Sequence, residues 1–483
     1  MAASRVVHVT ISDDGVAAHE LRDGIARIQE ELQVTPEFPE DVMVAAAAAV
    51  AAPRMPDLDR TDLPLVTIDP PTSMDLDQAM HITRDGDGYV VSYAIADLAA
   101  FISPGDPIDL EANKRGMTLY GADSRVPLHP PLISEGAASL LADQVCPALL
   151  WTIKVDATGE GTDVTVERAR VRSTAKLDYA GVQRAIDDGS ADETLMLLKE
   201  VGELRLAREA ARGGVSLPLP EQEVSVEGDR WHLEFRAQIP SEQWNAQISL
   251  LTGMAAASLM VYGRVGLLRT LPPADPRDVQ RLHRTARALG IDWPAEMLYP
   301  DFIRTLDPGR PTHAAMITAC TRLLRGSGYV GFVGELPEQS GHSALASEYA
   351  HVTAPLRRLG DRYAGEICVA MCAGDEVPGW VLDRLGELPQ TLQKADQVSH
   401  RYEGAVVDLV EAGVLHQRVG DTFTGVIVDV DPKDDKRGTI TVQDPAIEAR
   451  VTGSEPVPLG NEVTATLSQA DIGSRTVSFT LSS

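Results

Sequence analysis

The sequence predicts an α+β fold in three parts, and three observations support this prediction. The chain has 483 residues, 44% of them apolar and 24% charged, which is enough for one large core and small additional domains. Residues 61–415 combine short β-branched runs with long helical stretches, and from residue 418 onward short strands alternate with turns. We therefore expect a small N-terminal α/β region over 1–60, a mixed body over 61–415 and a β-barrel over 418–483.

The N-terminal region alternates short strand-like and helical pieces. An alanine-rich helix is expected over 44–52, and the proline- and aspartate-rich segment 53–64 marks the joint with the body. The first residues lack the basic head and apolar core of a signal peptide, and the apolar run 42–52 is too short to span a bilayer. We expect a cytoplasmic protein with no membrane partner, and a monomer.

The body opens with strands at 65–68 and 89–96, which we expect to be joined across the Gly/Asp-rich segment 84–88 as a hairpin loop. Its longest helices are expected over 192–212, 244–268, 276–289 and 391–415. The four cysteines form neither a CxxC pair nor a disulfide framework, so we expect buried, reduced thiols.

Three aspartates, Asp69, Asp75 and Asp77, follow the strand at 65–68 within nine residues. Carboxylates this close repel one another unless a cation lies among them, and oxygen ligands without nearby His or Cys favour Mg²⁺ or Mn²⁺ over zinc. Aspartate is also a common turn and capping residue, so the pattern alone is consistent with a structural role. Its context, T-I-D-x5-D-x-D-x-A followed by Y-A-I-A-D at 93–97, resembles the catalytic core of the ribonuclease II/RNB family of 3′-to-5′ exoribonucleases.

A second motif, Y-A-H-V-T-A-P-L-R-R-L-G-D at 349–361, is similar to an element of the same family and follows in the family's order. The resemblance places Arg357 where the family holds the scissile phosphate, a role that suits a planar guanidinium, and places Arg358 along the RNA. A solvated basic pair is the alternative for these two arginines.

Smaller segments extend the resemblance. G-M-T-L-Y at 116–120 and A-K-L-D-Y at 175–179 imply that Tyr120 and Tyr179 stack on RNA bases and that Lys176 contacts RNA. Tyrosine is also an ordinary core residue. Glu403 aligns with a family glutamate near the catalytic centre, although a solvated helix face would explain it equally. The resemblance thus implies Asp77, Arg357 and Glu403 as catalytic residues.

Three departures from the family pattern bear on activity. Gln78 stands where the family has a further aspartate, which keeps an oxygen donor in the expected metal set Asp69, Asp75, Asp77 and Gln78 but removes one charge. Leu217 replaces a stacking aromatic, and Leu250 replaces a glutamate that contacts ribose, so grip on RNA and discrimination against DNA are expected to differ. A weaker second metal, a slower enzyme or a silent one would each follow.

The charge balance opposes long-range attraction to phosphates, because 43 basic residues against 71 acidic ones give −28. A channel needs positive potential only along its RNA path, for which the candidates are Lys114, Arg115, Arg125, Lys176, Arg357 and Arg358. The last segment opens with V-G-D-T-F-T-G-V-I and resembles the OB-type (S1-like) RNA-binding barrel that the family carries there.

The leading hypothesis, implied by the resemblance, is a Mg²⁺-dependent (or Mn²⁺-dependent) exoribonuclease that degrades single-stranded RNA hydrolytically, 3′ to 5′, to nucleoside 5′-monophosphates. The competing hypothesis is a catalytically attenuated or silent RNB-fold protein that binds RNA or a protein partner. A third, a phosphohydrolase acting on something other than RNA, is disfavoured by the Arg357 and Tyr120 motifs.

Overall fold

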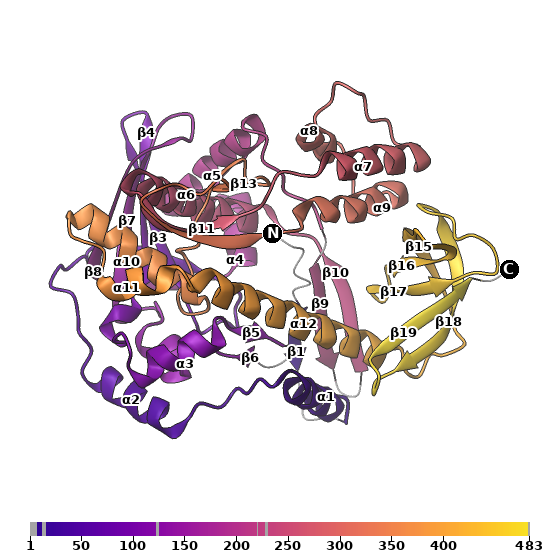
Figure 1. Cartoon of the computed structure of the whole chain (residues 1–483), viewed down its shortest axis with the longest axis horizontal. Helices are drawn as coiled ribbons and strands as arrows, with labels where there is room; N and C mark the ends of the chain where they lie inside the picture. The colour runs from indigo at the N-terminus through magenta and orange to yellow at the C-terminus, as the bar shows by residue number, and fades with distance from the viewer. Residues whose placement is uncertain (1–6, 12–15, 122–124, 220, 228–229, 482–483) are drawn as a thin grey trace.

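The computed structural model describes residues 7–11, 16–121, 125–219, 221–227 and 230–481. Its described part contains two closed five-stranded barrels, which lie at opposite sides of the view in Figure 1, with the long helix α12 (Leu388–Leu415) running between them. The contacts of α12 reach strands of the second barrel, α1 and β12, so this helix joins distant parts of the chain.

The first barrel is built from β2 (Leu65–Ile68), β3 (Gln78–Asp85), β4 (Gly88–Ala96), β7 (Val145–Val155) and β8 (Gly161–Leu177), in the order β2-β3-β4-β7-β8. The expected hairpin turn is present, since Asp85 pairs with Gly88 and Gly86 takes φ +59°, a conformation that glycine adopts without strain. It joins β4 to β3, however, and not to β2 as the sequence predicted, because β3 lies between these two strands in the barrel. The fully buried Tyr93 and Trp151 pair across β4 and β7. Strand β2 pairs in parallel with the C-terminal part of β8, and the aspartate segment follows β2 at this end of the barrel.

The second barrel confirms the predicted C-terminal β-barrel. It consists of β15 (Thr422–Asp431), β16 (Asp434–Val442), β17 (Ile447–Thr452), β18 (Glu462–Asp471) and β19 (Thr476–Leu481), closed in the order β15-β16-β17-β19-β18. Phe423 and Phe479 meet edge to face in its core, with ring centroids 5.6 Å apart. Alternating burial along β15 and β17 produces this core, as the period-2 pattern predicts.

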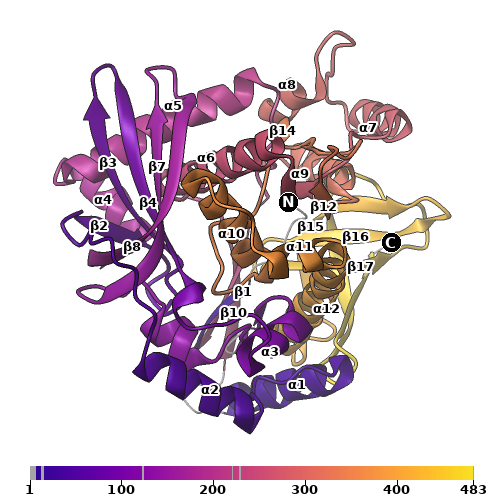
Figure 2. The same cartoon turned by 60° about the vertical axis from the view of Figure 1, so that its left-hand side comes forward.

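Helices cover and connect the barrels, as Figure 2 shows for the first one. They are α1 (Val16–Leu32), α2 (Glu40–Ala51), α3 (Pro107–Arg115), α4 (Tyr179–Asp188), α5 (Glu193–Ala211), α6 (Pro240–Gly263), α7 (Pro276–Ala288), α8 (Tyr299–Arg304), α9 (Pro311–Cys320), α10 (Leu359–Ala373), α11 (Gly379–Leu385) and α12. Asp178, Asp192 and Asp275 cap α4, α5 and α7 by accepting backbone N–H groups, which fixes where these helices begin.

One helix ends earlier than the sequence predicts. The pattern predicts a helix throughout 244–268, but α6 stops at Gly263 and Arg264 takes a left-handed conformation with φ 57°. The chain then forms β11 (Val265–Thr270), which pairs with β12 (Gly328–Val333). Pairing with a strand that is distant in the sequence overrides the local helical pattern.

Helix α6 is also the one helix among the described residues that is long and apolar enough to cross a membrane, by length and composition alone. It packs against α5, α10, α4 and β11, and side chains such as Trp244, Ile248 and Leu251 are buried in the main core. Its apolar composition is therefore explained by packing inside the protein.

The N-terminal elements β1 and α1 pack against later parts of the chain. Strand β1 (Val7–Ile11) pairs in parallel with β9 (Glu221–Glu227), which pairs with β10 (Arg230–Arg236), and α1 packs on α12. Four short strands, β5 (Leu119–Tyr120), β6 (Arg125–Val126), β13 (Gly341–His342) and β14 (Ser347–Glu348), complete the described strands. The division at residues 60 and 415 stays a prediction.

Candidate active site

The aspartate segment 69–77 links β2 to β3 at the end of the first barrel, and several hydrogen bonds hold it. The Asp69 N–H donates to the Leu177 carbonyl at 3.1 Å. Lys176 Nζ donates to the carbonyls of Pro71 and Ser73 at 2.7 and 2.6 Å. Ser139 Oγ accepts the Leu76 N–H at 2.9 Å. The segment thus has a defined shape even though it lacks regular secondary structure.

Asp77 is the most enclosed of the three carboxylates, with 4% of its surface exposed. Its Oδ1 accepts the Leu356 N–H at 2.8 Å, and its Oδ2 lies 3.4 Å from Arg357 Nε. Burial raises the pKa of Asp77 to about 8, against the lowering effect of Arg357 and of the Leu356 N–H, and nearby Asp75 raises it further. Cations of the protein therefore compensate this buried charge only in part.

Asp69 behaves in the same way. Burial raises its pKa to about 7 while Arg357 opposes the shift, and Asp75 contributes a repulsion that raises the pKa. Asp75 thus raises the pKa of both Asp69 and Asp77. It forms an ion pair with Arg125 Nη1 at 2.7 Å, and Arg125 also pairs with Glu135 at 2.7 Å.

The donor chemistry of this cluster fits a hard divalent cation, because three mutually repelling carboxylates, two of them poorly compensated, are arranged around one end of the barrel. Within the residues that the structure describes, no three acidic, His or Cys side chains are close enough to form a finished ligand set. Asp75 instead pairs with Arg125, and Asp77 with Arg357 and the Leu356 N–H.

Gln78 has contacts that the sequence did not suggest. Its Nε2 donates to the Thr353 carbonyl at 2.7 Å, and its Oε1 accepts hydrogen bonds from the Tyr93 hydroxyl and, at 3.3 Å, from Ser249 Oγ. The amide therefore connects β3 to the turn that carries Arg357 and to α6. Both ends of the amide are engaged by the protein, and the metal role expected for Gln78 stays a prediction.

The two expected RNA-binding cations also have structural partners. Arg358 forms hydrogen bonds to both carboxylate oxygens of Asp361, and Asp361 in turn accepts the Ala354 N–H at 2.8 Å. Lys176 holds the aspartate segment through the two carbonyls named above. These contacts explain both residues without RNA, and their RNA role stays a prediction.

The two tyrosines lie beside the carboxylates. The Tyr120 hydroxyl donates to Asp75 Oδ2 at 3.4 Å, and 38% of the residue is exposed. Tyr179 begins α4, and its hydroxyl accepts a hydrogen bond from Asn245 at 3.2 Å. Burial, followed by the charge of Asp69, raises the pKa of Tyr179 to about 12.

Glu403 accepts a hydrogen bond from Ser399 Oγ at 2.8 Å, one turn earlier in α12. This contact does not test its predicted place in the catalytic centre.

Sequence reasoning missed Ser249 and Asn245, which contact Gln78 and Tyr179 from α6. Their spacing of four residues on one helix face was a signal that could have indicated them.

Residues 58–371 match the RNB domain, and residues 421–482 match the RNase II-type exonuclease C-terminal S1 domain. The chain therefore belongs to the RNB family, and the resemblance seen in its motifs is confirmed.

Among curated relatives, Exosome complex exonuclease RRP44 homolog A of Arabidopsis thaliana is 26% identical over 72% of this chain and 38% of its own length. The chain spans between 33% and 62% of the length of eight of the curated relatives it matches.

Among solved structures, Mycoplasma genitalium RNase R in complex with ribose methylated single-stranded RNA has a TM-score of 0.85 at 19% identity, covering 96% of this chain and 78% of that one. Yeast Ssd1, a pseudonuclease, has a TM-score of 0.66 at 14% identity, covering 88% and 54%. These likenesses confirm the α+β fold with its C-terminal S1-type barrel.

Proposed function

We propose that this chain is a Mg²⁺-dependent hydrolytic exoribonuclease that shortens single-stranded RNA from its 3′ end and releases nucleoside 5′-monophosphates, with Mn²⁺ as the alternative cation. The observation that supports this most is the pair of carboxylates of half-buried Asp69 and buried Asp77, whose raised pKa values reflect incomplete compensation beside Arg357. RNB-family membership supplies the substrate class.

In this proposal Asp69, Asp75 and Asp77 would hold the cation. When bound, the cation supplies a water nucleophile of lowered pKa and stabilises charge on the leaving 3′ oxygen. Arg357 has a side chain that is 42% exposed, so its guanidinium can reach a phosphate while its Nε faces Asp77. It would neutralise charge that develops on the scissile phosphate.

Tyr120 and Tyr179 would hold the terminal nucleotides, because both lie next to the acidic cluster and present rings on which bases stack. Lys176 keeps the aspartate segment in shape, and Glu403 is retained as a candidate catalytic residue on α12. A monomer acting in the cytoplasm stays the expectation from the sequence.

A silent RNB protein is the second candidate function, and Gln78 favours it. Its amide occupies the place of a family carboxylate and is engaged at both ends. The likeness to yeast Ssd1 shows that the fold also occurs in a protein named as a pseudonuclease. Such a protein would bind RNA without shortening it.

The test is incubation of the full chain with 5′-labelled single-stranded RNA and Mg²⁺ or Mn²⁺, with identification of the released products. A ladder that shortens from the 3′ end, with nucleoside 5′-monophosphates released, supports the proposal. Binding without shortening, together with activity gained by Gln78→Asp, would assign the chain to the silent class.

A further inference from the structure

A cavity of about 530 Å³ lies at the end of the first barrel opposite to the aspartate segment. The β7–β8 turn, α5, α6 and β14 line it, and it is partly open to solvent. Gly161 at the start of β8 lines this cavity, whereas Leu177 at the end of the same strand contacts Asp69. The cavity is therefore distinct from the candidate active site.

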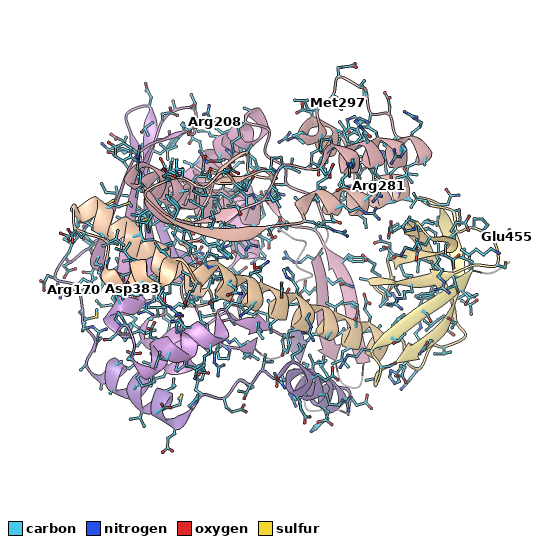
Figure 3. The ribbon with its side chains drawn as sticks, viewed as in Figure 1. Arg170, Arg208, Arg281, Met297, Asp383 and Glu455 are labelled. Atoms are coloured by element: carbon cyan, nitrogen blue, oxygen red, sulfur yellow. The ribbon has the colours of Figure 1, made fainter. Side chains whose placement is uncertain are left out.

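Three arginines at the C-terminal end of α5 face this cavity. Arg205, Arg208 and Arg212 follow one another at intervals of three and four residues, which places them on one helix face. Like charges at this spacing destabilise a helix unless something compensates them. Arg208 is compensated by an ion pair with Glu160 of the β7–β8 turn. Figure 3 labels Arg208 on α5.

Arg205 forms no such ion pair with any residue that the structure describes, although only 2% of it is exposed. One terminal nitrogen donates to the Gly159 carbonyl at 2.9 Å and the other to Met254 Sδ, a weak acceptor, at 3.3 Å. Among the described atoms, its Nε has no hydrogen-bond partner, and the same holds for Nη2 of Arg212. Burial and then the charge of Arg212 lower the pKa of Arg205 to about 10.

The other acidic residues of the cavity wall, Asp163 and Glu348, lie at its outer edge and have partners elsewhere. Asp163 lies 4.0 Å from Lys154, and its side chain is 63% exposed. Glu348 is exposed and accepts a hydrogen bond from Ser340 at 3.4 Å.

Buried Glu209 opposes the charges of Arg205 and Arg212, and its carboxylate accepts hydrogen bonds from Ser216 and Gln247. Three arginines against Glu160 and Glu209 leave one positive charge at the inner end of the cavity, where some N–H donors have no partner among the described atoms. Guanidinium groups in such a setting match the oxygens of a compact anion.

We infer that this cavity binds a phosphate group, either free phosphate or the phosphate of a nucleotide, through Arg205 and Arg212. Its volume lies within the range of small-ligand pockets. Tyr262, 92% exposed, lies outside the cavity wall but follows Ser258 of that wall by one helical turn, a spacing that puts the two residues on neighbouring positions of the α6 surface. A nucleoside attached to the phosphate would have this ring as a stacking surface.

The experiment is isothermal titration and thermal unfolding of the full chain in EDTA, with inorganic phosphate, adenosine 5′-monophosphate and adenosine as probes. The variants are Arg205→Met, Arg212→Met and the cavity-filling Ser258→Phe, so that the test survives if one of them does not fold. Arg281→Met, on the exposed face of α7, is the matched control, and Figure 3 labels this residue away from Arg208.

We expect phosphate-bearing probes to bind and to raise the unfolding temperature of the wild type and of Arg281→Met. Each cavity variant should bind about tenfold more weakly or not at all, since it removes a charge-assisted contact or the space. If Tyr262→Ala weakens the binding of adenosine 5′-monophosphate but not of inorganic phosphate, the ligand is a nucleotide. If the wild type binds these two probes with equal affinity, the ligand is free phosphate.

Equal binding by the wild type and all cavity variants, or no binding by the wild type, would overturn the inference. Asp77→Asn should leave this binding unchanged. The experiments can therefore show that phosphate binding in the cavity is wrong while the exoribonuclease proposal is correct. They can equally show phosphate binding in a chain that does not shorten RNA.

Discussion

At the scale of single residues, Arg357 and Asp77 form the most informative contact of the site. Arg357 Nε lies 3.4 Å from a carboxylate that is 4% exposed, while much of the arginine side chain remains accessible. A planar guanidinium can contact a carboxylate and a phosphate at the same time, and an ammonium group lacks that fork. Charge alone is therefore insufficient for the proposed role.

Arg357→Lys should accordingly lower the rate of RNA hydrolysis by about 10²-fold, the cost typical of removing one donor to developing charge. Single-turnover degradation of labelled RNA measures this rate. Arg184→Lys, on α4, serves as the control for arginine-to-lysine exchange. A wild-type rate in the Arg357→Lys variant would show that only a positive charge is required there.

Gln78→Asp tests the amide that joins three elements. Aspartate is shorter and cannot donate to the Thr353 carbonyl, so we expect a loss of about 1–3 kcal/mol in the free energy of unfolding. The added carboxylate should at the same time strengthen Mn²⁺ binding. Urea unfolding and Mn²⁺ titration measure the two effects, and unchanged values of both would refute the positioning role.

At the scale of elements, the segment 69–77 depends on Lys176, the penultimate residue of β8. Lys176→Met should remove both anchoring hydrogen bonds and lower the hydrolysis rate about tenfold through misplaced carboxylates. RNA affinity, measured by fluorescence anisotropy, should change less than about twofold if the lysine acts on the protein. Lys154→Met is the exposed control. If Lys176→Met lowers RNA affinity more than it lowers the hydrolysis rate, Lys176 binds RNA as the sequence predicts.

Sequence patterns predicted some elements better than others. The second barrel was predictable because its strands alternate buried and exposed residues between clear turns. The first barrel was not, since β7 is buried almost continuously and the parallel partner of β2 is β8, which lies far along the sequence. The end of α6 was missed because pairing of β11 with β12 decides it.

At the scale of the whole molecule, the site is assembled from segments that are far apart in the sequence. Motif order indicated Asp69, Asp75, Asp77 and Arg357, and the structure brings the segments carrying them together at one end of the first barrel. Local patterns could not show that Arg125 pairs with Asp75, or that Gln78 reaches Thr353 and Ser249. Such contacts depend on tertiary packing, which also determines which carboxylate oxygens are free to bind a cation.

Buried histidines give the molecule a predictable sensitivity to acid. Burial, then the charge of Arg362, lowers the pKa of His129 to about 3 from 6.5. Between these values the unfolded chain binds more protons than the folded one, so stability falls as the pH drops below about 6.5. From about pH 7 to about pH 5.5, His129 should account for a loss of about 1 kcal/mol.

Urea unfolding of the wild type and of His129→Leu at both pH values checks this expectation, because the comparison cancels the other titrating groups. The variant should lose less stability on acidification. An equal loss in the two proteins would show that His129 does not titrate as its burial implies.

The central claim is that the aspartate cluster positions a cation for RNA hydrolysis, and Asp77→Asn tests it most directly. The turnover rate with Mg²⁺ and the RNA dissociation constant are measured together, with Asp62→Asn, a largely exposed aspartate, as the control. We predict a loss of at least about 10²-fold in turnover with a less than about threefold change in RNA affinity. An equal loss of both, or full turnover by Asp77→Asn, would contradict the claim.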